Sequence, residues 1–308
     1  MSTLLPTEIE ESYNNKYKDL LSPENAYQFY LKVQFMIPKM AKKDEATYFY
    51  YISYAMKHLS SLNEKESSIA LLDLSLANYV KFHNAPENVD TFIKTFKYLY
   101  NAVPKKSDKT SFETSFLEYC DKSKIPDEQL TSNKIYEDFA NDCIDNEFFV
   151  RGYRFSLKTQ NIEILNKELT RLFQWEKLKI PELEKVYFIA RTTMEILLLK
   201  NIPLAKSFIF SHIKTVDNYN FNHPILNFSY LLTNLLSIED DTVNNYESFT
   251  KLKDNYEKAI KKEKSIGKYV NKISLLYYKK SSSSESGGFS LFNFLRAFTG
   301  EFRLYFKL

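Results

Sequence analysis

The sequence predicts an all-α protein, a right-handed α-solenoid of about fifteen helices paired into tetratricopeptide-like hairpins. Only 5 glycines and 9 prolines occur in 308 residues, and a many-stranded β fold would need more of these turn residues. The prolines fall where periodic apolar runs begin or end, and helical runs recur roughly every twenty residues. No repeat consensus recurs letter by letter, so a compact all-α domain is the alternative.

Helix-start signals order the first part of the chain. Pro23 opens a helix that runs to about Pro38, and Asp44 caps a second helix that reaches His58. A proline suits these positions because its fixed φ and missing N–H are tolerated at a helix start. Two helices are therefore expected before residue 60.

The next two helices follow the same logic. Asn63 and Glu66 have the spacing of a capping box, which predicts a third helix through Phe82. Asn84 and Pro86 then start a fourth. The further apolar helical runs each follow a proline, namely Pro104, Pro126, Pro181, Pro203 and Pro224. Three asparagines and a proline interrupt the helical period at 217–224, which predicts a loop or short hairpin insertion there.

Three regions are expected along the chain: N-terminal repeats in 1–145, C-terminal repeats in 146–280, and a tail in 281–308. Residues 1–150 hold 17 basic and 23 acidic side chains, whereas 151–308 hold 25 and 16. An acidic half and a basic half can select different partners by charge. Within the basic half, a lysine-rich stretch before the tail is most simply a solvated helix face.

The tail begins with "KKSSSSESGG", whose composition is typical of a flexible tether. The last twenty residues form an amphipathic pattern, with Leu291, Leu295 and Phe298 on one face and Arg296 away from it. This segment could dock on a partner, fold back on the solenoid, or lie on a membrane surface. Its charges exclude a membrane-spanning role, so no stable membrane insertion is expected.

Residue types give no sign of catalysis, so no enzyme activity and no cofactor are expected. The five glycines match neither a phosphate-binding loop nor a nucleophile elbow. The four histidines are scattered without metal-ligand spacing, and two cysteines cannot complete a zinc site. No basic and aromatic module for nucleic acid is present. The N-terminal stretch has no apolar signal region, which favours a cytosolic protein that acts by binding.

Several segments resemble those of a known family in matching order. "HPILNFSYLLTNLL" carries a Pro-x-Leu-Asn-Phe run through Pro224, Leu226, Asn227 and Phe228. Three further stretches also match, namely "MEILLLKNIPLAKSFIFSHI", "GGFSLFNFLRAFTG" and "ENAYQFYLKVQF". Together they resemble the Golgi-to-ER traffic protein four family, the cytosolic scaffolds of tail-anchored protein targeting. The sequence departs from the family pattern at Leu31 and Met36, where basic residues are expected, and at Pro23-Glu24, which replaces a Gly-Asp turn.

The resemblance implies a bridge between two partners. N-terminal repeats of this family hold the dimeric targeting ATPase, and C-terminal repeats hold a ubiquitin-like adaptor or, in some lineages, a BAG-family scaffold. The residues carried over for the ATPase side are Tyr27, Tyr30, Lys32, Phe35, Lys39 and Lys43. Those for the adaptor side are Phe221, His223, Pro224, Asn227 and Phe228, with Tyr230 at the rim.

The adaptor side depends most on Asn227. An amide within an apolar helix is costly if it is buried without a partner. It must therefore bond to a neighbouring part of the chain or to the backbone of a partner. A generic helical-repeat subunit of another cytosolic assembly is the alternative to the targeting scaffold.

Overall fold

The computed structural model describes residues 6–174, 180–215, 223–238 and 242–279. Every secondary-structure element in these ranges is helical, with sixteen α-helices and two short 3-10 helices. The all-α prediction is confirmed, and sixteen α-helices in the described residues agree with the expected number of about fifteen. The insertion predicted at 217–224 lies outside the described residues except for its last two positions.

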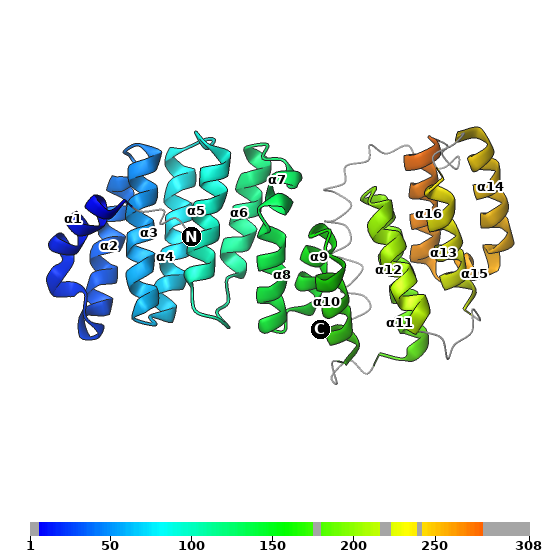
Figure 1. Cartoon of the computed structure of the whole chain (residues 1–308), viewed down its shortest axis with the longest axis horizontal. Helices are drawn as coiled ribbons and strands as arrows, with labels where there is room; N and C mark the ends of the chain where they lie inside the picture. The colour runs from blue at the N-terminus through cyan, green and yellow to red at the C-terminus, as the bar shows by residue number, and fades with distance from the viewer. Residues whose placement is uncertain (1–5, 175–179, 216–222, 239–241, 280–308) are drawn as a thin grey trace. The chain divides into compact units, whose positions relative to one another are not determined.

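The chain divides into two compact units, residues 1–159 and 160–308 (Figure 1). The helices of the first unit are α1 (Thr7–Tyr17), α2 (Ala26–Met40), α3 (Glu45–Ser61), α4 (Lys65–Phe82), α5 (Val89–Ala102), α6 (Thr110–Lys122), α7 (Asp127–Ser132), α8 (Ile135–Asp145) and α9 (Phe149–Lys158). Those of the second unit are α10 (Ile162–Gln174), α11 (Glu182–Leu198), α12 (Ile202–Thr215), α13 (Pro224–Leu236), α14 (Thr242–Asn255), α15 (Glu257–Lys262) and α16 (Lys264–Tyr278).

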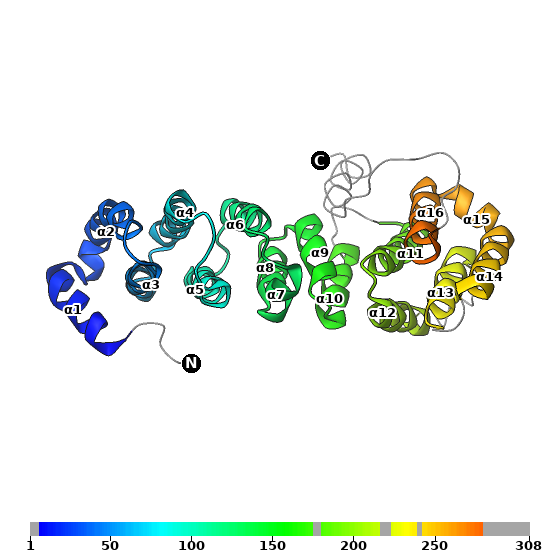
Figure 2. The same ribbon diagram turned by 90° about the horizontal axis from the view of Figure 1, so that it is seen from above.

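The first unit is built by serial stacking. α2 packs on α3 and α4, α3 packs on α5, and α4 packs on α6. Seen from above, α2, α4 and α6 lie in one row and α3 and α5 lie in the other (Figure 2). Each helix therefore buries its apolar side against near neighbours in sequence, as expected for an α-solenoid.

The predicted helix starts agree with the structure in part. The Asp44 carboxylate accepts a hydrogen bond from the Thr47 N–H at 2.8 Å, which confirms the cap of α3. α2 begins three residues after Pro23 and continues through Pro38 to Met40. α5 is capped by Asn88, which accepts from the Thr91 N–H at 3.0 Å, rather than by the earlier asparagine and proline.

The prediction of a capping box at Asn63 and Glu66 is wrong. Asn63 has φ 55° and its N–H bonds to the Ser60 carbonyl at 3.1 Å. In this left-handed conformation it ends α3 instead of starting α4. Glu64 occupies the N-cap position of α4 and makes no side-chain capping bond. Only three residues separate α3 from α4, so Asn63 is close to both helix ends, and its left-handed conformation assigns it to the end of α3.

The unit boundary falls after α9, whereas the sequence placed a boundary after residue 145. The difference is α9 itself, which packs along α8. Phe155 of α9 lies 5.3 Å from the ring of Phe139 in α8, and Arg151 pairs with Glu113 of α6 at 2.6 Å. These contacts keep α9 with the first unit.

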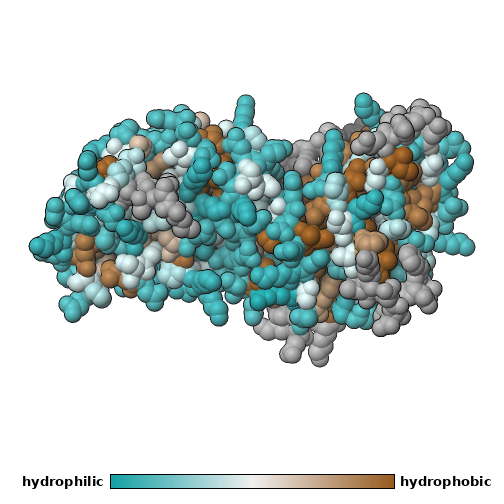
Figure 3. All heavy atoms as spheres, in the orientation of Figure 1, coloured by the Kyte–Doolittle hydropathy of each residue, from teal (hydrophilic) through white to brown (hydrophobic). Residues whose placement is uncertain are grey.

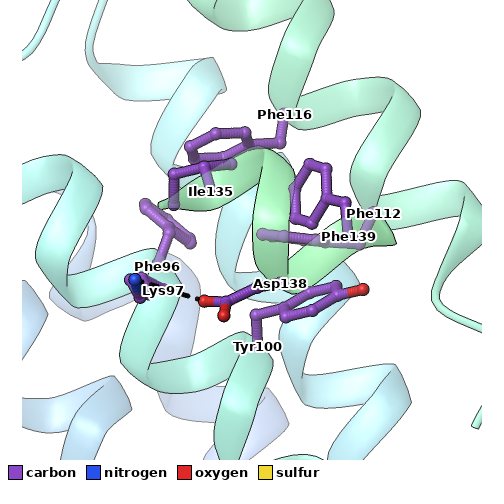
Figure 4. A pocket seen from close by; sticks show the side chains of 8 residues that line it. All are labelled: Phe96, Lys97, Tyr100, Phe112, Phe116, Ile135, Asp138 and Phe139. Carbon is purple, nitrogen blue, oxygen red and sulfur yellow. Dashed lines mark ion pairs between the residues drawn. The ribbon is translucent and has the colours of Figure 1, made fainter. Parts of the chain in front are cut away.

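Aromatic side chains fill the core between α5, α6 and α8 (Figure 4). A gap there is lined by Phe96, Tyr100, Phe112, Phe116, Ile135 and Phe139, with Lys97 and Asp138 at its edge. The Lys97 ammonium lies 3.4 Å from the Asp138 carboxylate, as the dashed line shows. The gap has no room for a water molecule, so it is part of a packed core and not a ligand site.

The second unit folds back on itself. α11 packs on α12 and α13 and also on α16, the last helix described (Figure 2). Tyr269 of α16 donates a hydrogen bond to Glu195 of α11 at 2.7 Å. Tyr277 donates to the Leu197 carbonyl at 2.7 Å. The chain thus returns to the helix near its start, a departure from purely serial stacking.

Candidate protein-binding surfaces

α2 has one buried side and one exposed apolar side. The buried side consists of Ala26, Phe29, Val33, Ile37 and Met40. On the exposed side, Tyr27, Leu31 and Phe35 are 63%, 44% and 67% exposed. Residues four apart lie above one another on a helix. The three side chains therefore form one continuous line, which we call the α2 ridge.

The α2 ridge differs from ordinary surface apolar residues. Single exposed apolar side chains are common and need no explanation. Three large ones in line on one helix form a contiguous patch, and such patches mark interaction sites. Tyrosine and phenylalanine are also enriched at the centres of protein interfaces.

The other predicted ATPase-side residues lie on α2 or in the turn that follows it. Tyr30 is half-buried, with its ring centroid 6.3 Å from that of Tyr27, and burial is the main cause that raises its pKa. The Lys39 ammonium lies 4.2 Å from the Phe35 ring centroid. Lys32 is exposed on α2 and Lys43 in the turn that follows. Among the described residues, none of these lysines has an ion-pair partner. The exposed apolar line of α2 is therefore accompanied by lysines on the same helix and in the turn after it, of which Lys39 lies against Phe35.

The predicted adaptor-side residues surround the start of α13. His223 is the N-cap residue without a side-chain capping bond, and Pro224 is the first helical residue. Asn227 donates from Nδ2 to the Tyr256 hydroxyl at 2.6 Å. This bond supplies the internal partner that its position requires. Phe221 lies outside the described residues.

Phe228 and Tyr230 differ in exposure. Phe228 is fully buried, and its ring centroid lies 5.7 Å from that of Tyr256. It therefore belongs to the core of the second unit, where a partner cannot touch it directly. Tyr230 is half-buried. Of the described residues in the predicted set, Pro224 is exposed, and His223, Asn227 and Tyr230 are half-buried.

A pocket opens beside this helix start. It has a volume of about 440 Å³ and is lined by residues of α11, α13, α14 and α15 and the junctions between them, namely Leu183, Val186, Tyr187, His223, Pro224, Ile225, Asn255, Tyr256, Lys258, Ala259 and Lys262. Leu183 is 52% exposed at its rim. An apolar wall with two lysines on α15 suits an apolar side chain of a partner that also carries acidic groups. In Figure 3, further exposed apolar side chains gather over α12 and α13.

Sequence reasoning missed most of this pocket. The i, i+4 pair Lys258 and Lys262 stands in the lysine-rich stretch that was interpreted as a solvated face. Leu183 and Tyr187 are apolar residues at helical spacing in α11, and that spacing alone does not show that they line a pocket. The available signal was two lysines four apart that follow Tyr256, but the sequence does not show that α15 lies next to α13.

Potential catalytic groups are buried or bonded within the fold. Burial raises the pKa of the Cys120 thiol to about 12, so the reactive thiolate is strongly disfavoured. His83 Nε2 lies 3.1 Å from the Ala41 carbonyl. Within the described ranges, no group of three or more His, Cys, Asp or Glu side chains could hold a metal ion. None of the described helices is long and apolar enough to cross a membrane.

Comparison with known proteins places the chain in a family. The model of the Golgi to ER traffic protein 4 family matches residues 41–298, which is most of the sequence. The chain belongs to the Golgi to ER traffic protein 4 family. This membership supports a role for this scaffold-type chain in the targeting of tail-anchored proteins.

A solved Golgi to ER traffic protein 4 structure has the same fold. The crystal structure of C. therm. Get4 aligns with a TM-score of 0.68 at 12% sequence identity, covering 94% of this chain and 95% of that chain. At this identity the likeness establishes the fold alone. No curated protein sequence matches the chain.

The family match and the candidate surfaces overlap unequally. The Golgi to ER traffic protein 4 match contains α13 and the whole adaptor-side set. It begins at residue 41, after the end of α2. Of the ATPase-side residues only Lys43 falls inside it. The assignment of the α2 ridge as a binding surface is therefore supported by the geometry of this chain and not by the family match.

Proposed function

We propose that the chain is a scaffold that bridges the dimeric targeting ATPase to a ubiquitin-like adaptor or BAG-family scaffold. The ATPase binds the α2 face of the first unit, and the adaptor binds at the pocket beside α13. The chain thereby brings the ATP-loaded ATPase beside a chaperone that carries a tail-anchored client. Membership in the Golgi to ER traffic protein 4 family is the observation that carries this proposal.

The α2 ridge supports the first binding surface. Its three large side chains are exposed, although folding buries most side chains of this size. Burying them against a partner removes apolar area from water. Lys32 and Lys39 on α2, and Lys43 in the turn after it, can then orient an acidic partner surface.

The pocket at α13 supports the second surface. Its lining comes from α11 and from the turn between α14 and α15, which are far apart in the sequence. The pocket therefore exists only in the folded unit. The Asn227–Tyr256 hydrogen bond connects two of these walls. An adaptor held here would occupy a preformed site, which lowers the entropy lost on binding.

Any effect on ATP hydrolysis would be exerted through binding. A scaffold that binds one nucleotide state of the ATPase better than another shifts its population toward that state. The difference in affinity sets the largest possible shift. The proposed preference is for the ATP-bound state.

The test is capture of partners by the purified full chain from its own cytosol, with an ATP analogue or with ADP. Recovery of the targeting ATPase with the ATP analogue supports the proposal. Recovery of a different stable assembly in both nucleotide states would favour the generic helical scaffold instead.

Surface variants then separate the two sites. Tyr27→Ser with Phe35→Ser is expected to lose the ATPase and keep the adaptor. Lys258→Glu with Lys262→Glu is expected to do the reverse. Leu275→Ser, at a residue 44% exposed on α16, is the matched control and should keep both partners. Equal loss of both partners in every variant would contradict the assignment of surfaces.

A further inference from the structure

α16 has one buried face and one basic face. The helix packs on α11 and α15 (Figure 2). Its buried residues are Ile266, Tyr269, Val270 and Ile273. Residues four and seven apart share a face of a helix. Lys268, Lys272 and Leu275 therefore lie together, on the side of α16 away from the buried residues.

The basic face of α16 lies at the surface of the second unit. Lys268 is exposed, Lys272 is half-buried and Leu275 is 44% exposed. Lys279, directly after the helix and four residues beyond Leu275, is also exposed. The sequence of α16 contains no aspartate or glutamate. We call Lys268, Lys272, Leu275 and Lys279 the α16 lysine face.

The chain after α16 continues with basic and then aromatic residues. Residues 264–308 include eight basic and two acidic side chains. Residues 289–308 lie outside the described residues, and their sequence holds six phenylalanines and one tyrosine. Leu291, Leu295, Phe298 and Phe302 recur at spacings of three and four, the period of an amphipathic helix. This tail has three basic residues against one acid, which is a weak basic face for binding a membrane surface alone.

We propose that the α16 lysine face and residues 289–308 together bind the surface of a membrane that contains anionic lipid. The lysines pair with lipid head groups, and the aromatic tail lies in the interface with its apolar side toward the acyl chains. Stable peripheral binding takes two such signals. Each lysine near an anionic surface strengthens binding about fivefold. The binding is reversible and needs no membrane-spanning segment.

The connection between the two parts suits a shared surface. Residues 280–288 join them with a sequence rich in serine and glycine. A linker of nine such residues has a root-mean-square span of roughly 15–18 Å, and a helix of the length of α16 is about 22 Å long. The tail can therefore reach the plane that the α16 lysine face touches, with no fixed geometry between the two.

A protein partner fits these features less well. An acidic protein surface accounts for the lysines but leaves six phenylalanines without a role, whereas an apolar groove leaves the lysines unused. A protein that bound both parts would have to match two sites whose separation a Ser/Gly linker does not fix. A lipid surface accepts both parts at any separation, because it is continuous in two dimensions.

The α16 lysine face is separate from both surfaces of the proposed function. No residue of α16 lines the pocket at α13, and the α2 ridge belongs to the first unit. Lipid binding at α16 therefore requires neither the ATPase nor the adaptor. It can be tested on the chain alone, and its failure leaves the proposed function untouched.

The test is flotation of the purified full chain with phosphatidylcholine vesicles, with or without about one third phosphatidylserine. Flotation is expected with the mixed vesicles. Binding should be at least tenfold weaker with phosphatidylcholine alone, and it should weaken as salt is raised.

The tail is tested by two variants of the full chain. Phe298→Ser with Phe302→Ser should weaken binding to the mixed vesicles at least tenfold, because two large apolar side chains no longer leave water. Phe298→Trp provides a fluorescent probe, read against the wild-type chain with its single tryptophan. Its emission is expected to shift to shorter wavelength when the mixed vesicles are added.

Matched variants separate the α16 lysine face from net charge. Lys268→Gln with Lys272→Gln should weaken vesicle binding at least tenfold. Lys251→Gln with Lys261→Gln makes the same change in net charge at two exposed lysines of α14 and α15, each paired with a glutamate. This control should weaken binding less than about twofold, because salt screens charges that do not touch the membrane. Thermal unfolding of both variants shows whether the fold is retained.

Several outcomes would overturn the proposal. Equal flotation with and without phosphatidylserine, or none with either, would exclude an anionic membrane as the ligand. Equal weakening by the two lysine variants would assign the binding to net charge. A tail tryptophan that emits at short wavelength without vesicles, and does not change when they are added, would assign the tail to the chain's own surface. Binding of inorganic polyphosphate without flotation would assign the α16 lysine face to a soluble anion.

Discussion

The guanidinium Nε of Arg151 in α9 lies 2.6 Å from the carboxylate Oε2 of Glu113 in α6. The other carboxylate oxygen accepts from the Tyr100 hydroxyl of α5 at 2.8 Å. Glu113 is 1% exposed, so its charge depends on these two partners. Burial raises the pKa of the Glu113 carboxyl, while Arg151 and the hydrogen bonds act to lower it. Three helices therefore meet at one buried acid.

Removing the acid should destabilise the first unit. Glu113→Ala leaves Arg151 without its anion and Tyr100 without its acceptor, so we expect a loss of about 3–5 kcal/mol in the free energy of unfolding. Urea unfolding followed by circular dichroism measures it. Lys94→Ala, which breaks the exposed pair with Asp90, is the control and should cost less than about 0.5 kcal/mol. A similar cost for both variants would refute a special role for the buried acid.

Acid should destabilise the second unit through His212. Burial lowers the pKa of His212 from 6.5 to about 4, and its Nε2 lies 3.1 Å from Asn166 Oδ1. Below pH 6.5 the unfolded state binds a proton at His212, whereas the folded state binds this proton only below about pH 4. The stabilisation by neutral His212 is therefore present above pH 6.5 and is lost on going down to pH 4.

Substitution of His212 isolates this effect. Between pH 7 and pH 5 the wild-type chain should lose roughly 1–2 kcal/mol through this residue. His212→Gln, which keeps an amide able to reach Asn166, should lose correspondingly less over the same interval. Unfolding free energies at both pH values provide the comparison. An unchanged pH dependence in the variant would assign the acid sensitivity to other groups.

Glu168 should have the opposite pH dependence. It is 1% exposed, neither carboxylate oxygen accepts a hydrogen bond from a described residue, and burial raises its pKa from 4.5 to about 8. The folded state keeps the proton that the unfolded state releases above pH 4.5. Stability contributed by protonated Glu168 is thus full below pH 4.5 and is lost by about pH 8.

A neutral isostere should remove this loss. Glu168→Gln is expected to stabilise the chain by about 1–3 kcal/mol at pH 8 and by much less at pH 5. Thermal unfolding at the two pH values measures the difference. Glu118→Gln, at a carboxylate on α6, provides the same chemical change as a control. Destabilisation of Glu168→Gln at pH 8 would mean that the ionised carboxylate has a partner.

Neighbouring residues on α13 should respond differently to truncation. Phe228→Ala removes a fully buried ring and is expected to cost about 3–5 kcal/mol. Asn227→Ala removes the bond to Tyr256 and should cost only about 0.5–1.5 kcal/mol. Urea unfolding separates them, and adaptor capture by Asn227→Ala tests whether the pocket wall matters. Equal costs would show that the Asn227 amide is as important to the core as the Phe228 ring.

The sequence predicted the helical class and much of the helix order because proline and apolar period act locally. Pro126, Pro181 and Pro224 stand at helix starts. Local signals fail where one residue could serve either of two helices, as at Asn63. They also carry no information on contacts between helices far apart in sequence. The return of α16 onto α11 and the link from Arg151 to Glu113 could not be deduced from periodicity.

The candidate surfaces show the same limit at the level of single residues. Tyr27 and Phe35 are separated by two steps of four residues. Their spacing alone therefore predicts that they lie on the same side of α2. Asn227 and Phe228 are adjacent, and the sequence could not decide which of them faces the core. The Asn227 amide bonds to Tyr256, a residue 29 positions away, while the Phe228 ring is buried. Membership of a site therefore depends on packing that no local pattern encodes.

The two hydrogen bonds between α16 and α11 join residues separated by 74 and 80 positions. A ribosome must therefore finish nearly all of the second unit before its central helix obtains its last partner, whereas each helical pair of the first unit can pack soon after it emerges. Shortening the chain from its carboxyl end would strip α11 of one side of its core. The first unit, whose contacts are nearly all between neighbours, is the better place for evolution or engineering to add or remove a repeat.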